Sequence, residues 1–276
     1  CGHCVPCASG RPALCEPAAV AGGAGTLLSG GKRIRRGGQT VSHLLGVSAF
    51  AEYATCSRRS LIKVDPELPF EHAALFGCAV LTGVGAVFNT ARIEPGTTVA
   101  VIGLGGVGLS AVLGAVCAGA ERILAIDLAE DKLAMAASLG ATDTFKAGPG
   151  AAGAIREATA GGVHYALEMA GAIPALELAY RITRRGGTTV TGGLPSPTAI
   201  LPLPALSLIG EERTLKGSYM GSAVPSRDIP RYVALYRRGK LPVDRLLTGC
   251  LKLDDINEAF DALREGRAIR QVVTFM

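Results

Sequence analysis

The stretch Thr98-Val-Ala-Val-Ile-Gly-Leu-Gly-Gly-Val-Gly108 decides the fold of the middle of the chain. Its apolar opening predicts a buried strand, and the residues that follow, Leu109 to Ala118, have helical composition. Between them, Gly103 permits a tight turn, Gly105 lets backbone amides approach a pyrophosphate, and Gly108 lets the helix pack closely on the strand. The positive end of the helix would add attraction for phosphate. A strand, this loop and a helix in succession therefore predict a dinucleotide-binding unit.

A carboxylate follows the next apolar run. Arg122-Ile-Leu-Ala-Ile126 ends at Asp127, nineteen residues beyond Gly108. An acid at this spacing can accept the ribose hydroxyls of an adenosine and would repel the extra phosphate of NADP, which favours NAD. Alternatively, Asp127 only caps a helix over Leu128 to Leu139. Lys132, in the first turns of that helix, either reaches the same ribose or is an ordinary surface lysine.

Short apolar runs and helical segments alternate as far as residue 219. We expect further strands over residues 142–145, 163–169, 188–191 and 214–219, with helices over residues 154–159 and 173–181. With the strands over 98–102 and 122–126 this makes six. The pattern predicts an α/β fold, a Rossmann doubly wound six-stranded parallel sheet covered by helices on both faces.

Four of the eight cysteines lie within the first fifteen residues. Cys1, Cys4 and Cys7 are three positions apart, and a short loop brings Cys15 back to them. Four thiolates at such a spacing can close a tetrahedron around one zinc ion and leave no open position, so this zinc would be structural. An iron–sulfur centre fits less well because its usual run has three residues before the last cysteine and a proline after it. Another metal and disulfide bonds are the remaining alternatives.

Composition narrows the classes of protein. Charged residues make up 18% and hydrophobic residues 49% of the 276 residues, which fits a well-buried globular enzyme rather than a disordered chain. The basic run from Lys32 to Arg36 lies between glycines without interleaved aromatic residues, so we interpret it as a solvated loop and expect no nucleic-acid partner. Apolar runs are too short for a membrane helix. Eight cysteines without a visible export signal indicate a reducing, cytoplasmic location.

Several motifs, in the same order, resemble those of the zinc-dependent medium-chain alcohol dehydrogenases. The similarity is to the long-loop branch, which includes the classical alcohol dehydrogenases and the glutathione-dependent formaldehyde dehydrogenases, and it extends from Cys1 to Met276. The motifs are the cysteine lobe, His43–Tyr53, Phe76–Gly85, Val101–Gly108 and Leu253–Phe260. The resemblance implies that residues 1–79 form the C-terminal part of a GroES-like, β-rich catalytic domain with a structural zinc lobe. Residues 80–222 would form the NAD-binding Rossmann domain, and residues 223–276 a return segment of the catalytic domain.

The resemblance also implies roles for individual residues. Cys78 would be the last of three protein ligands to a second, catalytic zinc, whereas by itself it would be interpreted as a buried core cysteine. The implied coenzyme residues are Thr82 and Val107 at the nicotinamide half, Asp127 and Lys132 at the adenosine ribose, Arg270 at the pyrophosphate, and the loop glycines Gly103, Gly105, Gly106 and Gly108. The implied substrate-cleft residues are Leu44, Leu45, Leu194 and Tyr219, whose alternative interpretation is ordinary core.

The activity that the resemblance implies is that of an NAD-dependent zinc alcohol dehydrogenase. Hydride would pass between an alcohol or aldehyde and the coenzyme while zinc stabilises the alkoxide. Family members place the other two ligands of the catalytic zinc ahead of the cysteine lobe, so we expect an N-terminally truncated chain that is inactive alone. We also expect a homodimer, or a homo-oligomer, formed through the sheet edge near residues 214–220.

Two other functions stay open. One is a formaldehyde dehydrogenase that acts on S-(hydroxymethyl)glutathione or another thiol adduct. The glutathione-dependent enzymes carry an arginine four residues past the last lobe cysteine to bind the adduct's carboxylate, and here that position is Ala19, which disfavours this reading. The other is a module that binds NAD and zinc without catalysis.

Overall fold

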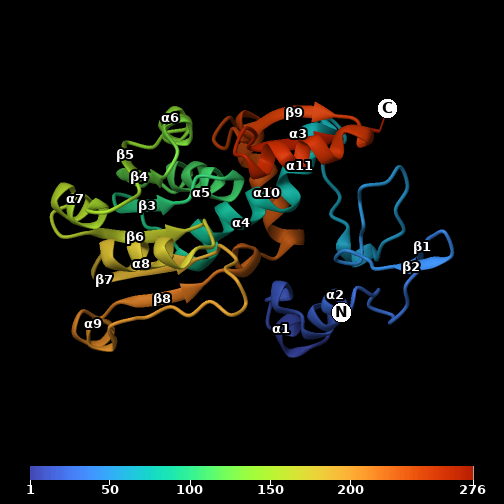
Figure 1. The fold of residues 1–276 in the computed structure, drawn as a ribbon, viewed down its shortest axis with the longest axis horizontal. Coiled ribbons are helices and arrows are strands. Elements are labelled where there is room, and N and C mark those ends of the chain that lie inside the picture. Colours follow the sequence, from blue (N-terminus) through green and yellow to red (C-terminus); the bar gives the residue numbers. More distant parts are fainter. Residues whose placement is uncertain (276) are drawn as a thin grey trace. The chain divides into compact units, whose positions relative to one another are not determined.

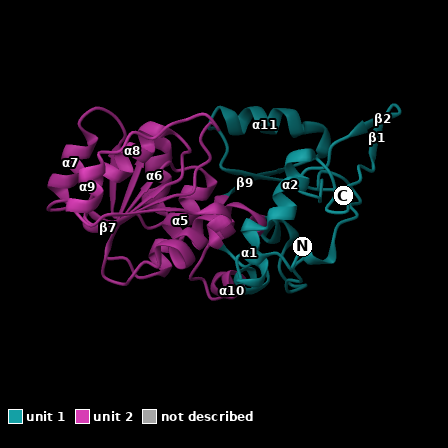
Figure 2. Ribbon diagram, turned by 90° about the horizontal axis from the view of Figure 1, so that it is seen from below, with its two compact units in different colours: residues 1–74, 223–230, 247–276 teal, residues 75–222, 231–246 magenta. Residues whose placement is uncertain are grey.

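The computed structural model describes residues 1–275 and divides them into two compact units (Figure 2). Unit 1 contains Cys1–Ala74, Ala223–Pro230 and the chain from Leu247 onward, drawn in teal. Unit 2 contains Leu75–Ser222 and Arg231–Leu246, drawn in magenta. Of residues 223–275, Arg231–Leu246 belong to unit 2 and the others to unit 1.

Within the described residues, unit 2 is built on a six-stranded parallel sheet (Figure 1). Its strands are β3 (Thr98–Ile102), β4 (Arg122–Asp127), β5 (Asp143–Lys146), β6 (Val163–Glu168), β7 (Thr183–Thr191) and β8 (Thr214–Gly217). Their order is β5-β4-β3-β6-β7-β8, and each neighbouring pair is parallel. This is the doubly wound order, so the predicted fold class is confirmed. The order reverses beside β3, and ligands of such sheets bind at the carboxyl ends of the strands at that point.

Helices alternate with these strands because the strands are apolar on both faces. The helices of unit 2 are α4 (Ala79–Gly85), which continues as a π-helical turn (Ala86–Ala91), α5 (Gly106–Cys117), α6 (Glu130–Ser138), α7 (Ala151–Ala158), α8 (Ile173–Ile182) and α9 (Ala205–Gly210). Alternate residues of β3 and β4, such as Ile102 and Leu124, pack with Ile155 of α7 and Ile182 of α8 in one buried cluster. Continuous burial of this kind is typical of parallel strands covered on both sides.

One strand differs from its prediction. The expected strand over residues 188–191 begins at Thr183, because Gly186 and Gly187 lie inside β7 rather than before it. The pairing with β6 shifts register there, and Gly186 has a φ of 70°. A glycine in the left-handed region is typical of a bulge, so the two glycines bend the strand instead of ending it.

Unit 1 contains shorter elements. Its helices are α1 (Val5–Ala8), α2 (Glu16–Ala24), α3 (Phe70–Ala73) and α11 (Ile256–Arg264), and its strands are β1 (Ile34–Arg36), β2 (Gln39–Val41), β9 (Leu247–Leu251) and β10 (Arg270–Val273). The strands β1 and β2 form an antiparallel hairpin, and β9 and β10 a parallel pair. Helix α10 (Pro225–Arg237) contains residues of both units. Short 3-10 turns occur at Pro12–Leu14, Arg58–Ser60, Ala74–Gly77, Tyr219–Ser222, Val243–Leu246 and Leu253–Asp255.

The basic run is partly strand rather than loop. Arg35 and Arg36 lie on β1, and Gly37 and Gly38 turn the chain with φ values of 52° and 79°. Two consecutive positive φ angles suit the tight turn of a two-residue hairpin. The side chains from Lys32 to Arg36 are exposed apart from the half-buried Ile34, as expected for a solvated segment.

No single helix in residues 1–275 is long and apolar enough to cross a membrane. One bent pair, Phe70–Gly77 with Ala79–Ala91, meets the length and composition criteria together across a 52° bend.

Helices α4 and α5 cross so closely that Gly83 has no room for a side chain. A Cβ on Gly83 would lie 2.2 Å from the carbonyl oxygen of Val107 and 2.7 Å from the amide nitrogen of Ala111. We expect Gly83→Ala to lower the free energy of unfolding by roughly 1–3 kcal/mol, because backbone must move apart to admit the methyl group. Urea denaturation measures this change.

The matched control is Gly153→Ala in α7, where no atom lies within 4 Å of the new Cβ. That change should raise stability by about 0.5–1 kcal/mol through helix propensity alone. Equal stability of Gly83→Ala and the wild type would contradict the packing described here.

Candidate functional site

The glycine loop after β3 is tight at two positions and open at a third. Gly103 has a φ of 86°, and a Cβ there would lie 2.7 Å from the Cβ and amide nitrogen of Ala170. A Cβ on Gly108 would lie 1.8 Å from the carbonyl oxygen of Gly103. At Gly105, by contrast, no atom lies within 4 Å of the Cβ position, and the residue is exposed. The loop is therefore open at the residue whose backbone is expected to face a phosphate.

Helix α5 begins directly behind this opening. Gly105 is its N-cap residue and accepts a hydrogen bond from the Leu109 amide at 2.9 Å. The amides of Gly106, Val107 and Gly108 are thus in the first turn, where a helix provides no carbonyl partner for them. First-turn amides at the positive end of a twelve-residue helix are the arrangement that attracts an anion.

Asp127 joins the glycine loop to the turn after β4. Its Oδ2 accepts a hydrogen bond from the Leu104 amide at 2.7 Å, and its Oδ1 accepts from Leu128 at 2.8 Å and Ala129 at 3.1 Å. The carboxylate therefore orders the turn before α6, but it does not cap that helix, because the N-cap residue is Ala129 and no side chain bonds to the cap. It is only half-buried, so a ligand beside the loop could still reach it. Lys132, also half-buried, lies in the first turn of α6.

The other predicted coenzyme and substrate residues are divided between the units. Thr82 is buried in α4, and Arg270 lies on β10 in unit 1. The four side chains assigned to the substrate cleft are all exposed. They are Leu44 and Leu45 in unit 1, and Leu194 after β7 and Tyr219 after β8 in unit 2. Their exposure contradicts the interpretation of these four residues as ordinary core.

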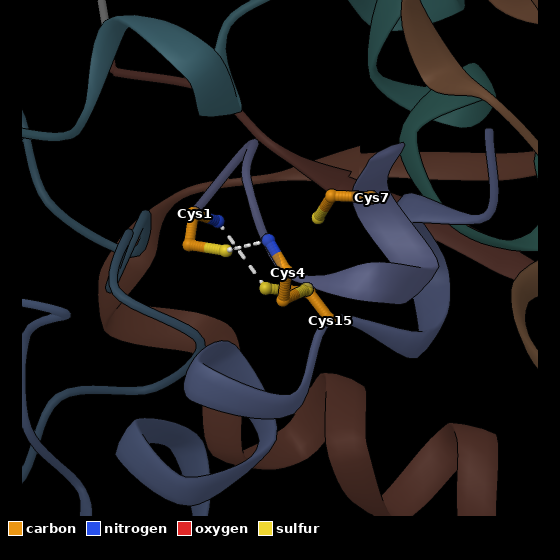
Figure 3. A group of neighbouring side chains, drawn as sticks. All are labelled: Cys1, Cys4, Cys7 and Cys15. Carbon is orange, nitrogen blue, oxygen red and sulfur yellow. Dashed lines mark hydrogen bonds between the residues drawn. The ribbon is translucent and has the colours of Figure 1, made fainter. Parts of the chain in front are cut away.

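Cys1, Cys4, Cys7 and Cys15 converge in the lobe that opens the chain (Figure 3). Their Sγ atoms all lie within 4.8 Å of one another. Four ligands at 2.3 Å around one zinc would have sulfur–sulfur edges of about 3.8 Å, so a small contraction would suffice to bind the ion. In residues 1–275 all eight cysteines are free thiols, which argues against the disulfide alternative.

Hydrogen bonds to sulfur favour the ionised form of the Cys15 thiol in this cluster. The amides of Cys4 and His3 donate to the Cys1 Sγ at 3.4 and 3.5 Å, and the Cys1 nitrogen donates to the Cys15 Sγ at 3.2 Å (Figure 3 shows the first and last). Burial alone would raise the pKa of the Cys15 thiol. Hydrogen bonds from the Ala18 amide, the Cys1 amine and the neighbouring thiols outweigh burial and lower that pKa to about 7. Thiolates are the form that metals bind.

A second metal centre does not assemble from the described residues. Cys78 lies at the N-cap of α4 and is exposed, so it is not the core cysteine that its residue type alone suggested. Within residues 1–275 no other group of three His, Cys, Asp or Glu side chains lies close enough to hold an ion. Cys78 by itself does not fit a catalytic zinc, which needs three protein ligands and one open position.

Glu168 is a buried acid that sequence reasoning missed. It is the last residue of β6, pairs in register with Ile102 of β3, and is 1% exposed. The available signal was an acid at the end of an otherwise apolar strand, the same signal that identified Asp127 on β4. Its position beside the glycine loop depends on the β3–β6 pairing, which spacing along the chain does not specify.

Comparisons with known proteins agree with this geometry. Residues 106–238 match a family model described as zinc-binding dehydrogenase. An alcohol dehydrogenase zinc-binding domain protein from Burkholderia ambifaria has a similar structure, with a TM-score of 0.95 and 34% identity over 100% of this chain and 75% of its own. Benzyl alcohol dehydrogenase from Acinetobacter calcoaceticus has a TM-score of 0.91 and 31% identity, with the same coverage of 100% and 75%. Alcohol dehydrogenase TADH from Thermus sp. ATN1 has a TM-score of 0.81 and 28% identity over 100% of this chain and 75% of its own.

The cysteine cluster generates a prediction about metal content. We expect the purified chain to hold about one zinc ion, and Cys7→Ser to lose most of it, because a serine hydroxyl replaces a soft thiolate in a closed four-ligand shell. Elemental analysis by mass spectrometry measures both. Cys117→Ser, outside the cluster, is the control and should keep its zinc. Iron in place of zinc, or full zinc retention by Cys7→Ser, would contradict the assignment.

Proposed function

Because the chain belongs to the zinc alcohol dehydrogenase family of medium-chain dehydrogenases, we propose that it acts as an NAD-dependent alcohol dehydrogenase. The reaction would move a hydride between an alcohol or aldehyde and NAD⁺ or NADH. The observation that carries this proposal is the open glycine loop at Gly105, with the first-turn amides of α5 on one side and the Asp127 carboxylate on the other.

The residues of this loop fit a dinucleotide. The amides of Gly106, Val107 and Gly108 would hold the pyrophosphate, and the absence of a side chain at Gly105 lets the phosphates come close to the backbone. Asp127 would accept hydrogen bonds from the adenosine ribose on its accessible side while the Leu104 amide keeps the carboxylate in place. The bound coenzyme would supply the hydride acceptor, and the chain supplies its position.

The proposed zinc of the cysteine lobe has a structural role. Four thiolates fill the coordination shell, so no position remains for a substrate oxygen. Among the described residues, Cys78 is the candidate ligand for a catalytic zinc, and one thiolate does not complete such a site.

The proposed substrate is an uncharged alcohol rather than a thiol adduct. Ala19 in α2 occupies the position where a glutathione-dependent enzyme is expected to carry an arginine, and it offers no partner for a carboxylate. Assays of alcohol oxidation with aliphatic, aromatic and glutathione-adduct substrates, followed by NADH absorbance, would separate these classes. This chain alone is expected to bind NADH and zinc without turnover, because Cys78 by itself does not fit a catalytic zinc. The assay therefore uses the protein with all three zinc ligands, and binding without turnover there would support the non-catalytic module instead.

We also propose that two copies associate through β8. Within residues 1–275 this strand ends the sheet, so one row of its backbone amides and carbonyls has no neighbouring strand there. Such an edge is a template for pairing with another chain. Light scattering of the purified protein tests the proposal, and a monomeric mass would refute it.

The position of Asp127 generates a prediction about coenzyme choice. We expect NADH to bind at least about tenfold more tightly than NADPH, because a carboxylate beside the ribose repels a 2′-phosphate. Asp127→Asn should reduce this preference to within about threefold, since the amide retains one acceptor oxygen but no charge. Titration by nicotinamide fluorescence gives both dissociation constants.

A suitable control is Asp143→Asn, which neutralises an acid that pairs with Arg122 at 2.7 Å at the start of β5, the opposite end of the sheet from the loop. That variant should keep the wild-type preference for NADH. Equal binding of NADH and NADPH by the wild type would refute the role given to Asp127.

A further inference from the structure

The buried carboxylate of Glu168 accepts three hydrogen bonds, two from the turn that follows its own strand and one from the end of the neighbouring strand. Its Oε1 accepts from the amides of Ala170 at 2.7 Å and Gly171 at 2.6 Å, in the turn that follows β6. Its Oε2 accepts from the Thr191 hydroxyl at 2.7 Å, at the end of β7. Three donors therefore fix a carboxylate that is 1% exposed.

The main chain of the same residue reinforces this link. The carbonyl oxygen of Glu168 accepts from the amides of Gly192 at 2.9 Å and Gly193 at 3.3 Å, in the turn that follows β7. The side chain thus holds the turn after β6 and the last residue of β7. The main-chain carbonyl holds the turn that follows β7. Both turns lie at the carboxyl edge of the sheet.

These two turns pack against the glycine loop without room for side chains. A Cβ on Gly103 would lie 2.7 Å from Ala170, and a Cβ on Gly193 would lie 2.1 Å from the amide nitrogen of Gly171. On the other side, a Cβ on Gly171 would lie 2.8 Å from the amide nitrogen of Leu194. The glycine loop and the two turns are therefore stacked in direct backbone contact, and a shift of one must move the next.

The place of Glu168 in the sheet separates it from Asp127. Asp127 ends β4, in the half of the sheet made by β3, β4 and β5, whereas Glu168 ends β6, in the half made by β6, β7 and β8. In a doubly wound sheet each half holds one mononucleotide of the ligand. Asp127 is proposed to bind the adenosine ribose. The turns held by Glu168 lie in the other half of the sheet and therefore belong to the nicotinamide side.

We propose that Glu168 is a positioning residue that sets the nicotinamide side of the coenzyme site. It would do so by holding the turns at Ala170–Gly171 and Gly192–Leu194 against the glycine loop, without touching the coenzyme. This inference rests on the proposed function. An apolar residue would leave the Ala170 and Gly171 amides without their partner, and such unpaired groups let a turn rearrange. Locking a site's supporting residues in this way is what fixes its geometry.

The test compares two ligands in three variants of the full chain. NADH carries the nicotinamide and ADP-ribose lacks it, so the ratio of their dissociation constants reports on the nicotinamide side. Glu168→Leu removes all three acceptor contacts, and we expect the NADH dissociation constant to rise at least about tenfold while that for ADP-ribose changes less than about threefold. Thr191→Val removes one donor, and we expect a rise of about threefold for NADH alone. Glu168→Gln keeps one oxygen for the two amides and should restore binding to within about threefold of the wild type.

A second readout follows the environment of the ring directly. The fluorescence emission of bound NADH should shift toward that of free NADH in Glu168→Leu and Thr191→Val, and stay unchanged in Asp143→Asn. If Glu168→Leu does not fold, Thr191→Val decides, because it changes one hydroxyl and leaves the carboxylate with two amide donors.

The outcomes separate this inference from the proposed function. A wild-type chain that does not bind NADH refutes the coenzyme site itself. If the wild type binds NADH but Thr191→Val has the wild-type dissociation constant and emission, Glu168 has no positioning role. Equal weakening of NADH and ADP-ribose in Glu168→Leu would also overturn the inference, because it would mean a general loss of the fold.

Discussion

The contact between Gly108 and the carbonyl of Gly103 is the constraint on which unit 2 depends. A Cβ on Gly108 would lie 1.8 Å from that oxygen, so the first turn of α5 rests directly on the backbone that leaves β3. Only glycine permits this approach. The contact sets where the positive end of α5 points, and α5 in turn packs on α4 at Gly83, where again no Cβ fits. The anion site and the helix layer are therefore consequences of one backbone contact.

Two acids flank β3, and their difference in exposure separates their roles. Asp127 ends β4 and Glu168 ends β6, the two strands that pair with β3. Each accepts backbone amides from turns at the carboxyl edge, and Asp127 holds Leu104 in the glycine loop itself. Asp127 is half-buried and can meet a ligand, whereas Glu168 is buried and can act only through the turns that it holds. A shared position at the strand ends thus leaves one carboxylate accessible to a ligand and buries the other among the turns that it holds.

Sequence reasoning succeeded where the determinant is local. The strand, loop and helix around Gly103 to Gly108 and the spacing of the lobe cysteines are short-range patterns, and the six parallel strands followed from regular alternation. It failed where the pairing between strands determines the local structure. Gly186 and Gly187 have turn composition, but pairing with β6 keeps them in β7 as a bulge. Glu168 looked like an ordinary strand end because its three donors come from Ala170, Gly171 and a different strand.

The two units draw on different sources of stability. Unit 2 has continuous burial in β3 and β4, so its core needs no metal. In residues 1–74, by contrast, Cys15 and Leu68 are the buried apolar side chains, and α1 and α2 bury none of theirs. A metal bound by four thiolates contributes folding free energy that does not depend on buried area, which is why small lobes of this kind use one. Four thiolates brought together by the first fifteen residues would hold this lobe without relying on buried area.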